Sequence, residues 1–192
     1  MAPFASREAA LAWATSIVGR DDVLFVDTET TGVRFGQDDV IDIGIVDHTG
    51  NIVMDQLVRP MVAVPADAEA IHGISNRQLQ TAPTIVQLWP DVKALLDGKL
   101  LISYNADFDL RMLKFAATRR NLEPIHPFRW DCAMEAFAAW NGQSSHHRPG
   151  FRWINLETAA RSLGIDPPTH RAIADAMVCL EVVQELSRRN RI

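Results

Sequence analysis

The spacing of hydrophobic positions along the chain divides it into segments of two kinds. Apolar runs rich in β-branched residues predict strands at 23–30, 39–60 (as a hairpin), 99–104 and the start of 128–140. Apolar residues that recur at helical spacing predict helices at 5–18, 83–98, 108–120, most of 128–140, 154–165 and 171–189. Pro90 falls inside the second of these helices and predicts a kink or a break there. Asp131 stands where its side chain would cap the helix that follows it.

The order of these elements indicates the fold class. A hairpin followed by alternating strands and helices is typical of a mixed sheet with helices packed on it. At 192 residues the chain is expected to form one α/β domain, in which residues 1–20 add a helical extension at the N-terminus. Residues 141–153 carry no predicted element, and their Gly, Ser and Pro content predicts a long loop.

Composition and charge narrow the class of protein. Apolar residues make up 47% of the chain and charged residues 22%, and no apolar run is long enough to cross a membrane. The N-terminal segment has neither the basic part nor the continuous apolar part of a signal peptide. We therefore expect a cytoplasmic protein whose two cysteines, Cys132 and Cys179, are buried thiols. The net charge of −5 argues against a broad basic surface for nucleic acid, but it allows local contact with a short piece of it.

Asp27 and Glu29 lie two residues apart at the end of an otherwise apolar strand. Side chains at this spacing point to the same face of a strand, so the two carboxylates lie close together. Like charges in such a place repel each other unless a cation lies between them. The alternative is that they cap the Thr-Thr-Gly turn that follows, and these two residues alone do not decide between the interpretations.

The segment SYNADFD (103–109) places two more aspartates at the start of a predicted helix. On a helical wheel Asp109 falls inside the apolar sector, whereas Asp107 falls on the polar side near Arg111. We therefore expect Asp107 to be solvated and paired with Arg111, four residues further on. Asp109 is the carboxylate that we expect to face the interior.

The last predicted helix repeats this anomaly. Asp175 falls on its apolar face, while Glu181 and Glu185 fall on its polar face. One such acid could be a protonated or hydrogen-bonded structural residue, but acids in three separate elements favour a divalent metal site, and ligands that are all oxygen favour Mg²⁺ or Mn²⁺ over zinc. A lone histidine at a helix start is usually a surface residue. His170, however, would lie beside the metals and could accept a proton from a water there.

Three segments, in this order, resemble the motifs of the DEDDh (DnaQ-like) 3′–5′ exonucleases: FVDTETTG (25–32), YNADFD (104–109) and HRAIADA (170–176). A fourth, IHGIS (71–75), resembles the segment with which that family contacts substrate. The family includes the proofreading subunit of bacterial DNA polymerase and ribonuclease T. Each motif is weak alone, but their common order and spacing over most of the chain are specific.

The resemblance implies an RNase H-like fold with a mixed five-stranded sheet, and hydrolysis of the terminal phosphodiester that releases nucleoside 5′-monophosphates. It implies that two divalent cations, Mg²⁺ or Mn²⁺, are held by Asp27, Glu29, Asp109 and Asp175. It also implies that His170 is the general base. The residues that it implies for substrate contact are Thr31 and Gly32 through their backbone, Ile71 and His72 against the terminal nucleotide, and Asn105 and Phe108 in the pocket.

The chain departs from the family pattern in two places. Tyr104 stands where a histidine is common, which leaves the four implied ligands intact. Residues 141–153 exceed the shortest form of the family and carry the basic and aromatic residues His146, His147, Arg148, Phe151, Arg152 and Trp153. Such side chains suit a loop that grips a strand through phosphate contacts and stacking. A partly buried aromatic hinge with a solvated tip is an equal alternative.

The expected partner is the 3′ end of single-stranded or frayed DNA or RNA. Two alternatives remain open, namely an enzyme for short RNA oligonucleotides and a nucleic-acid-binding module of the same fold without catalysis. The complete set of four acids and a histidine weighs against the second. The sequence leaves open the choice of DNA or RNA, and whether the protein acts alone, as a homodimer or with a polymerase in proofreading or DNA repair.

Overall fold

The computed structural model describes residues 4–146 and 149–190 of the chain. Its strands are β1 (Val23–Thr30), β2 (Val40–Asp47), β3 (Ile52–Leu57), β4 (Leu100–Ser103) and β5 (Arg129–Cys132). Its helices are α1 (Arg7–Ile17), α2 (Ala66–His72), α3 (Asn76–Leu79), α4 (Ile85–Leu96), α5 (Ala106–Thr118), α6 (Ala133–Asn141), α7 (Leu156–Leu163) and α8 (Ala172–Arg189). None of the helices described is both long enough and apolar enough to cross a membrane.

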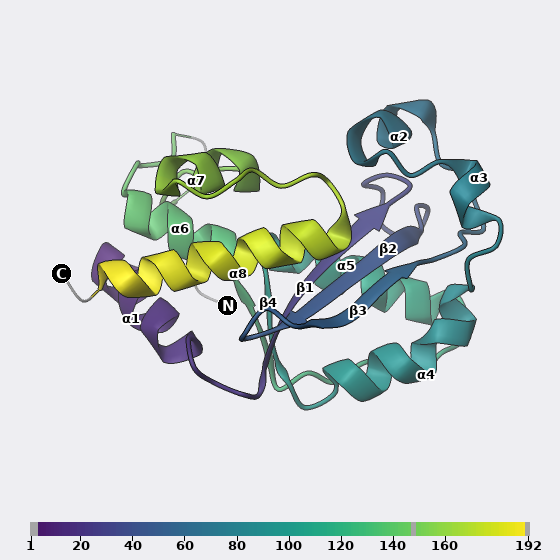
Figure 1. The fold of residues 1–192 in the computed structure, drawn as a ribbon, viewed down its shortest axis with the longest axis horizontal. Coiled ribbons are helices and arrows are strands. Elements are labelled where there is room, and N and C mark those ends of the chain that lie inside the picture. Colours follow the sequence, from purple (N-terminus) through teal and green to yellow (C-terminus); the bar gives the residue numbers. More distant parts are fainter. Residues whose placement is uncertain (1–3, 147–148, 191–192) are drawn as a thin grey trace.

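The strands form one mixed sheet in the order β3-β2-β1-β4-β5. The β2–β3 hairpin is antiparallel to β1, whereas β4 and β5 run parallel to β1 on its other side. The predicted mixed five-stranded sheet flanked by helices is therefore confirmed (Figure 1). Because β1 is central and parallel to β4, the carboxyl ends of these two strands lie at the same edge of the sheet.

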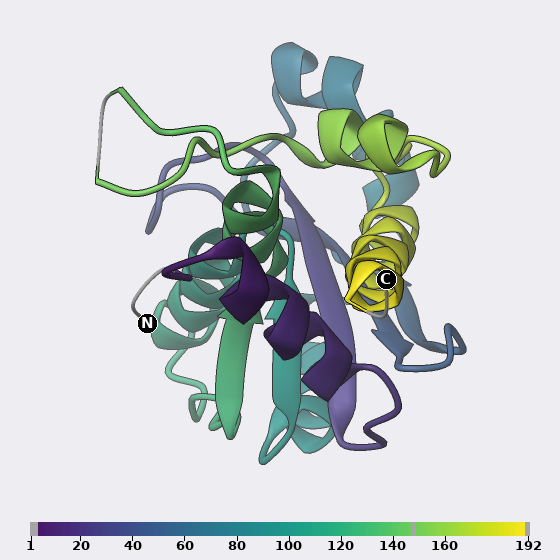
Figure 2. The ribbon, with the colours of Figure 1, turned by 90° about the vertical axis from the view of Figure 1, so that its left-hand side faces the viewer.

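Helices cover both faces of the sheet, and alternate residues of β1 point to each face. Val23 and Phe25 pack in a core with α1, α6, α7 and α8. Leu24 and Val26 pack in a second core with α4 and α5 on the opposite face. Figure 1 shows α8 crossing the strands, and Figure 2 shows α1 beside it over the same face. By this alternation, Asp27 and Glu29 belong to the face that α8 covers.

Helix α8 begins very close to the sheet because β2 carries a glycine beneath it. A Cβ on Gly44 would lie 2.2 Å from the carbonyl carbon of Ala172 and 2.3 Å from the backbone nitrogen of Ile173. Any side chain at position 44 would therefore push the first turn of α8 away from β2. The glycine fixes the height of this helix start above the strand, and with it the position of the residues on that turn.

At Pro90 the sequence predicts a kink or a break, and the structure shows no break: helix α4 continues through this residue, with the buried Trp89 and Val92 on either side. Two other local predictions are wrong. Asp131 does not cap α6; it lies in β5, where its carboxylate accepts a hydrogen bond from the Trp13 indole at 2.8 Å and pairs with Arg129 at 2.9 Å. Cys179 is buried as expected, but Cys132 is only partly buried.

The short helices α2 and α3 have no counterpart among the predicted elements, because a helix of one or two turns is too brief for hydrophobic periodicity to reveal. A readable signal did exist for α3. Ser75 and Gln78 form a capping box, in which each side chain bonds the backbone of the other residue. Both helices lie beyond the carboxyl end of β1 in Figure 1, so they build one wall of the same end of the sheet.

We predict that Gly44→Ala lowers the free energy of unfolding by about 2–3 kcal/mol, the upper part of the range for overpacking, because the added methyl group meets backbone rather than a flexible side chain. Urea denaturation checks this. Gly98→Ala is the control: its Cβ would meet nothing within 4 Å, and only its left-handed backbone (φ +72°) opposes the change. An unfolding midpoint for Gly44→Ala equal to that of the native chain would contradict the prediction.

Candidate active site

The acids singled out in the sequence gather at the carboxyl end of β1. Asp27 and Glu29 lie on β1 itself, Asp109 lies in the first turn of α5, and Asp175 lies in the first turn of α8. Helix α5 follows directly on β4, which is parallel to β1, so the topology alone brings the start of α5 to this edge. Helix α8 reaches it from the opposite face of the sheet.

The register of β1 and β2 shows to which face Asp27 and Glu29 point. Asp27 lies opposite Gly44 and Glu29 opposite Asp42, so both acids share the face on which α8 begins. The Thr-Thr-Gly turn is held by other groups: the Thr30 hydroxyl donates to the Gly32 carbonyl at 2.6 Å, and the backbone of Thr31 pairs with that of Asp39 at 2.9 Å. The two carboxylates are thus directed to the α8 side of the strand end.

The two aspartates of the SYNADFD segment differ as their wheel positions predict. The Asp107 side chain is 77% exposed and pairs with Arg111 at 3.4 Å. Asp109 is 3% exposed, and its Oδ1 accepts hydrogen bonds from the backbone N–H of Thr28 at 3.0 Å and from the Thr28 hydroxyl at 2.8 Å. Thr28 points to the α5 face of β1, so these bonds fix Asp109 to the strand between Asp27 and Glu29.

Glu29, His170 and Asp175 form the tightest group. One ligand atom from each lies within 4.8 Å of the others, which is close enough for one cation to bind all three. His170 is exposed and adopts a left-handed backbone conformation with φ +56°. Its backbone N–H donates to Asp175 Oδ1 at 3.1 Å, so the histidine and the aspartate are tied together. Asp27 and Asp109 lie outside this group of three; Asp109 is buried and Asp27 is partly buried.

Burial raises the pKa of every acid in the cluster, and the charges of neighbouring acids raise it further for Asp27 and Glu29. Burial is the largest cause for each of them, and it raises the pKa of Glu29 to about 8, that of Asp109 to about 7 and that of Asp175 to about 6. The pKa of Asp27 is raised well above its ordinary value by burial and by the charges of Asp109, Asp175 and Glu29. Without a cation, several of these groups are protonated near neutral pH.

The residues present therefore fit divalent metal ions. Four carboxylates from three elements converge, and their donor atoms are oxygens, which Mg²⁺ and Mn²⁺ prefer. Burial destabilises the charged form of these carboxylates, and a cation bound between them would offset that destabilisation. Asp27, Glu29, Asp109 and Asp175 are thus the candidate ligands.

Two further charged residues at this site were not predicted from the sequence. Asp42, on β2, is completely buried beside the cluster, and Arg171 reaches it with its Nε at 2.8 Å from Asp42 Oδ2. A signal was available, since Asp42 interrupts the apolar run VIDIGIV. The same argument that singled out Asp109 and Asp175, an acid in an apolar element, applies to it.

Three of the residues expected to contact substrate line one cavity. Thr31, Gly32 and Ile71 surround a space of about 490 Å³ between the turn after β1 and helix α2. Ile71 is 61% exposed although it is apolar. The Thr31 N–H already donates to the Asp39 carbonyl at 2.9 Å, which leaves the Gly32 backbone as the better placed of the two expected contacts.

The other three expected substrate residues do not line that cavity. His72 is buried, and its Nδ1 accepts a hydrogen bond from the Ile74 N–H at 3.0 Å. Asn105 is exposed immediately before α5. Phe108 packs against Phe35, with ring centroids 5.8 Å apart. These residues stand on α2 and α5, at the same end of the sheet as the acids.

The loop after α6 is partly ordered by its own hydrogen bonds. Ser144 and Phe151 form a β-bridge, and the Arg152 N–H donates to the Gln143 carbonyl at 2.7 Å. His147 and Arg148 lie outside the described residues. The loop and α7 enclose a cavity of about 660 Å³, lined by Phe137, Asn141, Gln143, Arg152, Trp153, Ile154, Asn155, Thr158 and Ser162.

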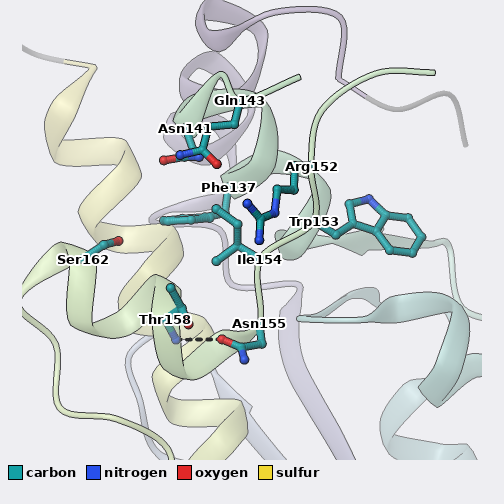
Figure 3. Close-up of a pocket in the computed structure, with 9 residues that line it drawn as sticks. All are labelled: Phe137, Asn141, Gln143, Arg152, Trp153, Ile154, Asn155, Thr158 and Ser162. Carbon is teal, nitrogen blue, oxygen red and sulfur yellow. Dashed lines mark hydrogen bonds between the residues drawn. The ribbon is translucent and has the colours of Figure 1, made fainter. Parts of the chain in front are cut away.

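This cavity is polar and carries no acid among its lining residues. Figure 3 shows the Arg152 side chain directed into it, while the ring of Trp153 points away from the other side chains drawn. Tyr104, which directly follows β4, connects the sheet to the lining of this cavity: its hydroxyl donates to the Ile154 carbonyl at 2.9 Å. Tyr104, where the family commonly has histidine, thus anchors the loop rather than taking part in the acid cluster.

Comparisons with known proteins agree with the geometry. An exonuclease family model (RNase_T) matches residues 24–183. An uncharacterized exonuclease of Escherichia phage 186 is 34% identical over 176 residues, 88% of this chain and 89% of the relative. The DNA polymerase III subunit epsilon of Treponema pallidum is 30% identical over 160 residues, 81% of this chain and 72% of the relative.

Solved structures are similar in fold. Exonuclease X in complex with 5′ overhanging duplex DNA superposes with a TM-score of 0.62 at 22% identity, over 87% of this chain and 92% of that one. The nuclease domain of 3′hExo, a DEDDh family member bound to rAMP, gives a TM-score of 0.63 at 19% identity, over 86% of this chain and 92% of that one.

We predict that metal-free protein loses stability as pH rises from about 5 to 8. The raised pKa values mean that the folded state holds protons that the unfolded state, with ordinary values of 3.8 and 4.5, has released. The stabilisation is full below pH 4 and is lost as pH rises through about 6–8. Melting temperatures in EDTA should fall across this range, and saturating Mg²⁺ should remove most of the fall.

Glu29→Gln is the matched variant, because it removes the group with the pKa of about 8. Its melting temperature in EDTA should fall less between pH 6 and 8 than that of the native chain. A melting temperature in EDTA that stays level or rises over this range would show that the acids are not held in the repulsive arrangement described.

Proposed function

Since this chain belongs to the exonuclease family, we propose that it is a metal-dependent 3′–5′ exonuclease that releases nucleoside 5′-monophosphates from single-stranded or frayed DNA or RNA. The observation that carries the proposal is the convergence of Asp27, Glu29, Asp109 and Asp175 at one end of β1, with His170 beside them. A binding module without catalysis has no need for four converging acids, whose mutual repulsion destabilises the fold.

The four acids would hold two divalent cations, Mg²⁺ or Mn²⁺. When bound, the cations supply a nucleophile at neutral pH and stabilise charge on the leaving oxygen. The chain's own contribution is to fix the acids in place: Thr28 holds one oxygen of Asp109, and the His170 N–H holds one oxygen of Asp175. Each keeps its second oxygen for a ligand role.

His170 would act as the general base. Its imidazole is exposed, so it can exchange protons with solvent, and one of its ring nitrogens lies within 4.8 Å of Glu29 and Asp175 carboxylate oxygens. A base of this kind must lie within reach of the attacking water.

The cavity beside Ile71 is the proposed seat of the terminal nucleotide. Its wall includes the backbone of Gly32, and the exposed apolar side chain of Ile71 offers a surface for a base. Asn105 and Phe108, at the start of α5, border the same edge of the sheet. A 3′ end held in this cavity would place its last phosphodiester toward the acids.

The test of the function is a denaturing gel with 5′-labelled single-stranded DNA and RNA of the same sequence, with Mg²⁺, Mn²⁺ or EDTA. We expect a ladder that shortens one nucleotide at a time from the 3′ end and that EDTA abolishes. The faster of the two ladders identifies the preferred sugar, and a series of lengths separates an oligonucleotidase from a polymer exonuclease. Intact substrate with both metals, on protein shown to be folded, would refute the proposal and favour a binding module.

We predict that Asp109→Asn lowers kcat by at least about 100-fold, because the amide keeps the shape of the side chain but loses the charge that a cation requires. Asp107→Asn is the matched control two residues away, on the exposed side of the same helix. It should change kcat by less than about 2-fold, since exposed ion pairs contribute little. Equal effects of the two variants, measured by initial rates on the same labelled strand, would refute the assignment of Asp109.

The loop 141–153 is proposed to bind the strand upstream of its 3′ end through Arg152. We predict that Arg152→Ala raises KM several-fold for a strand of about ten nucleotides and weakens its dependence on salt, because one phosphate contact is lost. KM for a dinucleotide, which is too short to reach the loop, should not change. A KM that is unaltered at every length and salt concentration would favour a structural hinge instead.

A further inference from the structure

Asp42 lies beneath the first turn of α8. In the register of β1 and β2 it lies opposite Glu29, and it is 0% exposed. It shares the face of β2 with Gly44, two residues further on, over which the backbone of Ala172 passes so closely that a Cβ would not fit. The carboxylate therefore sits at the place where the chain leaves His170 and enters the helix.

The Asp42 carboxylate binds this junction through one oxygen. Its Oδ2 accepts a charge-assisted hydrogen bond from Arg171 Nε at 2.8 Å and a second, at 3.3 Å, from the Ala172 N–H. Arg171 is the N-cap residue of α8, but its own side chain makes no capping hydrogen bond. Asp42 thus supplies from a neighbouring strand the acceptor that a serine or aspartate normally supplies at this position.

The backbone of His170 needs such support. Its φ of +56° is unfavourable for a residue with a Cβ, and such a conformation persists only where the surroundings hold it. The His170 N–H donates to Asp175 Oδ1 at 3.1 Å, and the next residue, Arg171, is held by Asp42. The two bonds together fix the stretch of backbone from which the His170 imidazole projects.

We propose that Asp42 and Arg171 are positioning residues for the reaction: their ion pair holds the His170 imidazole in place for proton transfer. The proposal rests on the proposed function, in which His170 is the general base. A role in stability alone explains Asp42 less well, because its Oδ1 is buried without a hydrogen-bond partner among the described residues. A buried carboxylate left partly unpaired is costly, and an apolar side chain would fill such a place more cheaply.

Arg171 offers a built-in control. Its guanidinium also approaches Asp55 on β3, at 3.9 Å, and the Asp55 side chain is 42% exposed. A long contact between exposed groups contributes little. Asp55→Asn removes one carboxylate near the same guanidinium without touching the bond to Asp42, so it should leave kcat and KM within about 2-fold of the native values.

The experiment is a double-mutant cycle in single-turnover cleavage of labelled single-stranded DNA with Mg²⁺. Asp42→Asn and Arg171→Ala should each lower the cleavage rate about 10- to 100-fold, as the loss of an orienting partner does, with substrate affinity changed less than about 3-fold. In a His170→Ala background neither change should lower the rate further, because the group that they position is absent. Losses that multiply in that background would overturn the proposal.

The two variants also separate positioning from electrostatics. Asp42→Asn removes a negative charge beside the acids, whereas Arg171→Ala removes a positive one. If their role were purely electrostatic, the two variants would therefore have opposite effects on the Mg²⁺ midpoint, and opposite effects on the rate. Positioning requires both rates to fall. If Asp42→Asn does not fold, Arg171→Ala, at a partly exposed side chain, completes the cycle alone.

A readout without catalysis completes the test. In metal-free protein, the imidazole ¹H–¹³C NMR signal of His170, assigned by its loss in His170→Ala, should shift and broaden in Asp42→Asn and Arg171→Ala and stay unchanged in Asp55→Asn. An unchanged His170 signal in all three variants would overturn the positioning role while leaving the exonuclease intact. Failure of the proposed function is distinguishable, because the native chain itself would then leave DNA uncut with either metal.

Discussion

The structure depends on concentrating negative charge where water is scarce. Four carboxylates, with Asp42 as a fifth close by, meet at the carboxyl end of β1. Burial raises the pKa values of the four, and charge repulsion adds to this for Asp27 and Glu29. Proteins avoid such an arrangement unless a cation compensates it. Thr28, His170 and Arg171 each donate a hydrogen bond to one carboxylate oxygen of Asp109, Asp175 and Asp42, respectively. The second oxygen of Asp109 and of Asp175 stays available for a metal ion.

The acids reach this point from both faces of the sheet, and that explains why the site lies at a strand end. Asp27 and Glu29 point to the α8 face, whereas Asp109 comes from α5, which packs on the other face. Residues from opposite faces can meet only where the sheet stops between them. Parallel β1 and β4 end at this edge, so α5 begins there, and Gly44 lets α8 begin there as well.

The same geometry connects binding with chemistry. The segment from Thr31 and the helix α2 enclose the cavity beside Ile71, while the segment before α8 carries His170. The Asp39 backbone N–H donates to the Thr31 hydroxyl and holds the first segment at the start of β2, and the Asp42 carboxylate on β2 accepts a hydrogen bond from Arg171 and holds the second. The proposed function needs the nucleotide seat and the base fixed relative to the metal ligands, and both segments are anchored at β1 and at β2 or its start.

The sequence by itself determined the strands, the longer helices, the mixed sheet and the identity of the four acids, but not the short helices α2 and α3. Asp109 and Asp175 could be found because helical periodicity records burial, and burial is a local property of a helix face. The motifs, read in order, added His170 and the exonuclease family. What lay within one helix or strand was readable, including which of Asp107 and Asp109 turns inward.

The tertiary structure decided what depends on segments far apart in the chain. Asp42 and Arg171 are separated by 129 residues, and nothing in the local pattern of either predicts that they bind each other. The same is true of Asp131. The sequence predicts that it caps a helix, but in the structure its carboxylate accepts a hydrogen bond from Trp13 of α1. Periodicity reports how exposed a side chain is, whereas its hydrogen-bond partner depends on strand register and on the distance between elements, which only the assembled chain fixes.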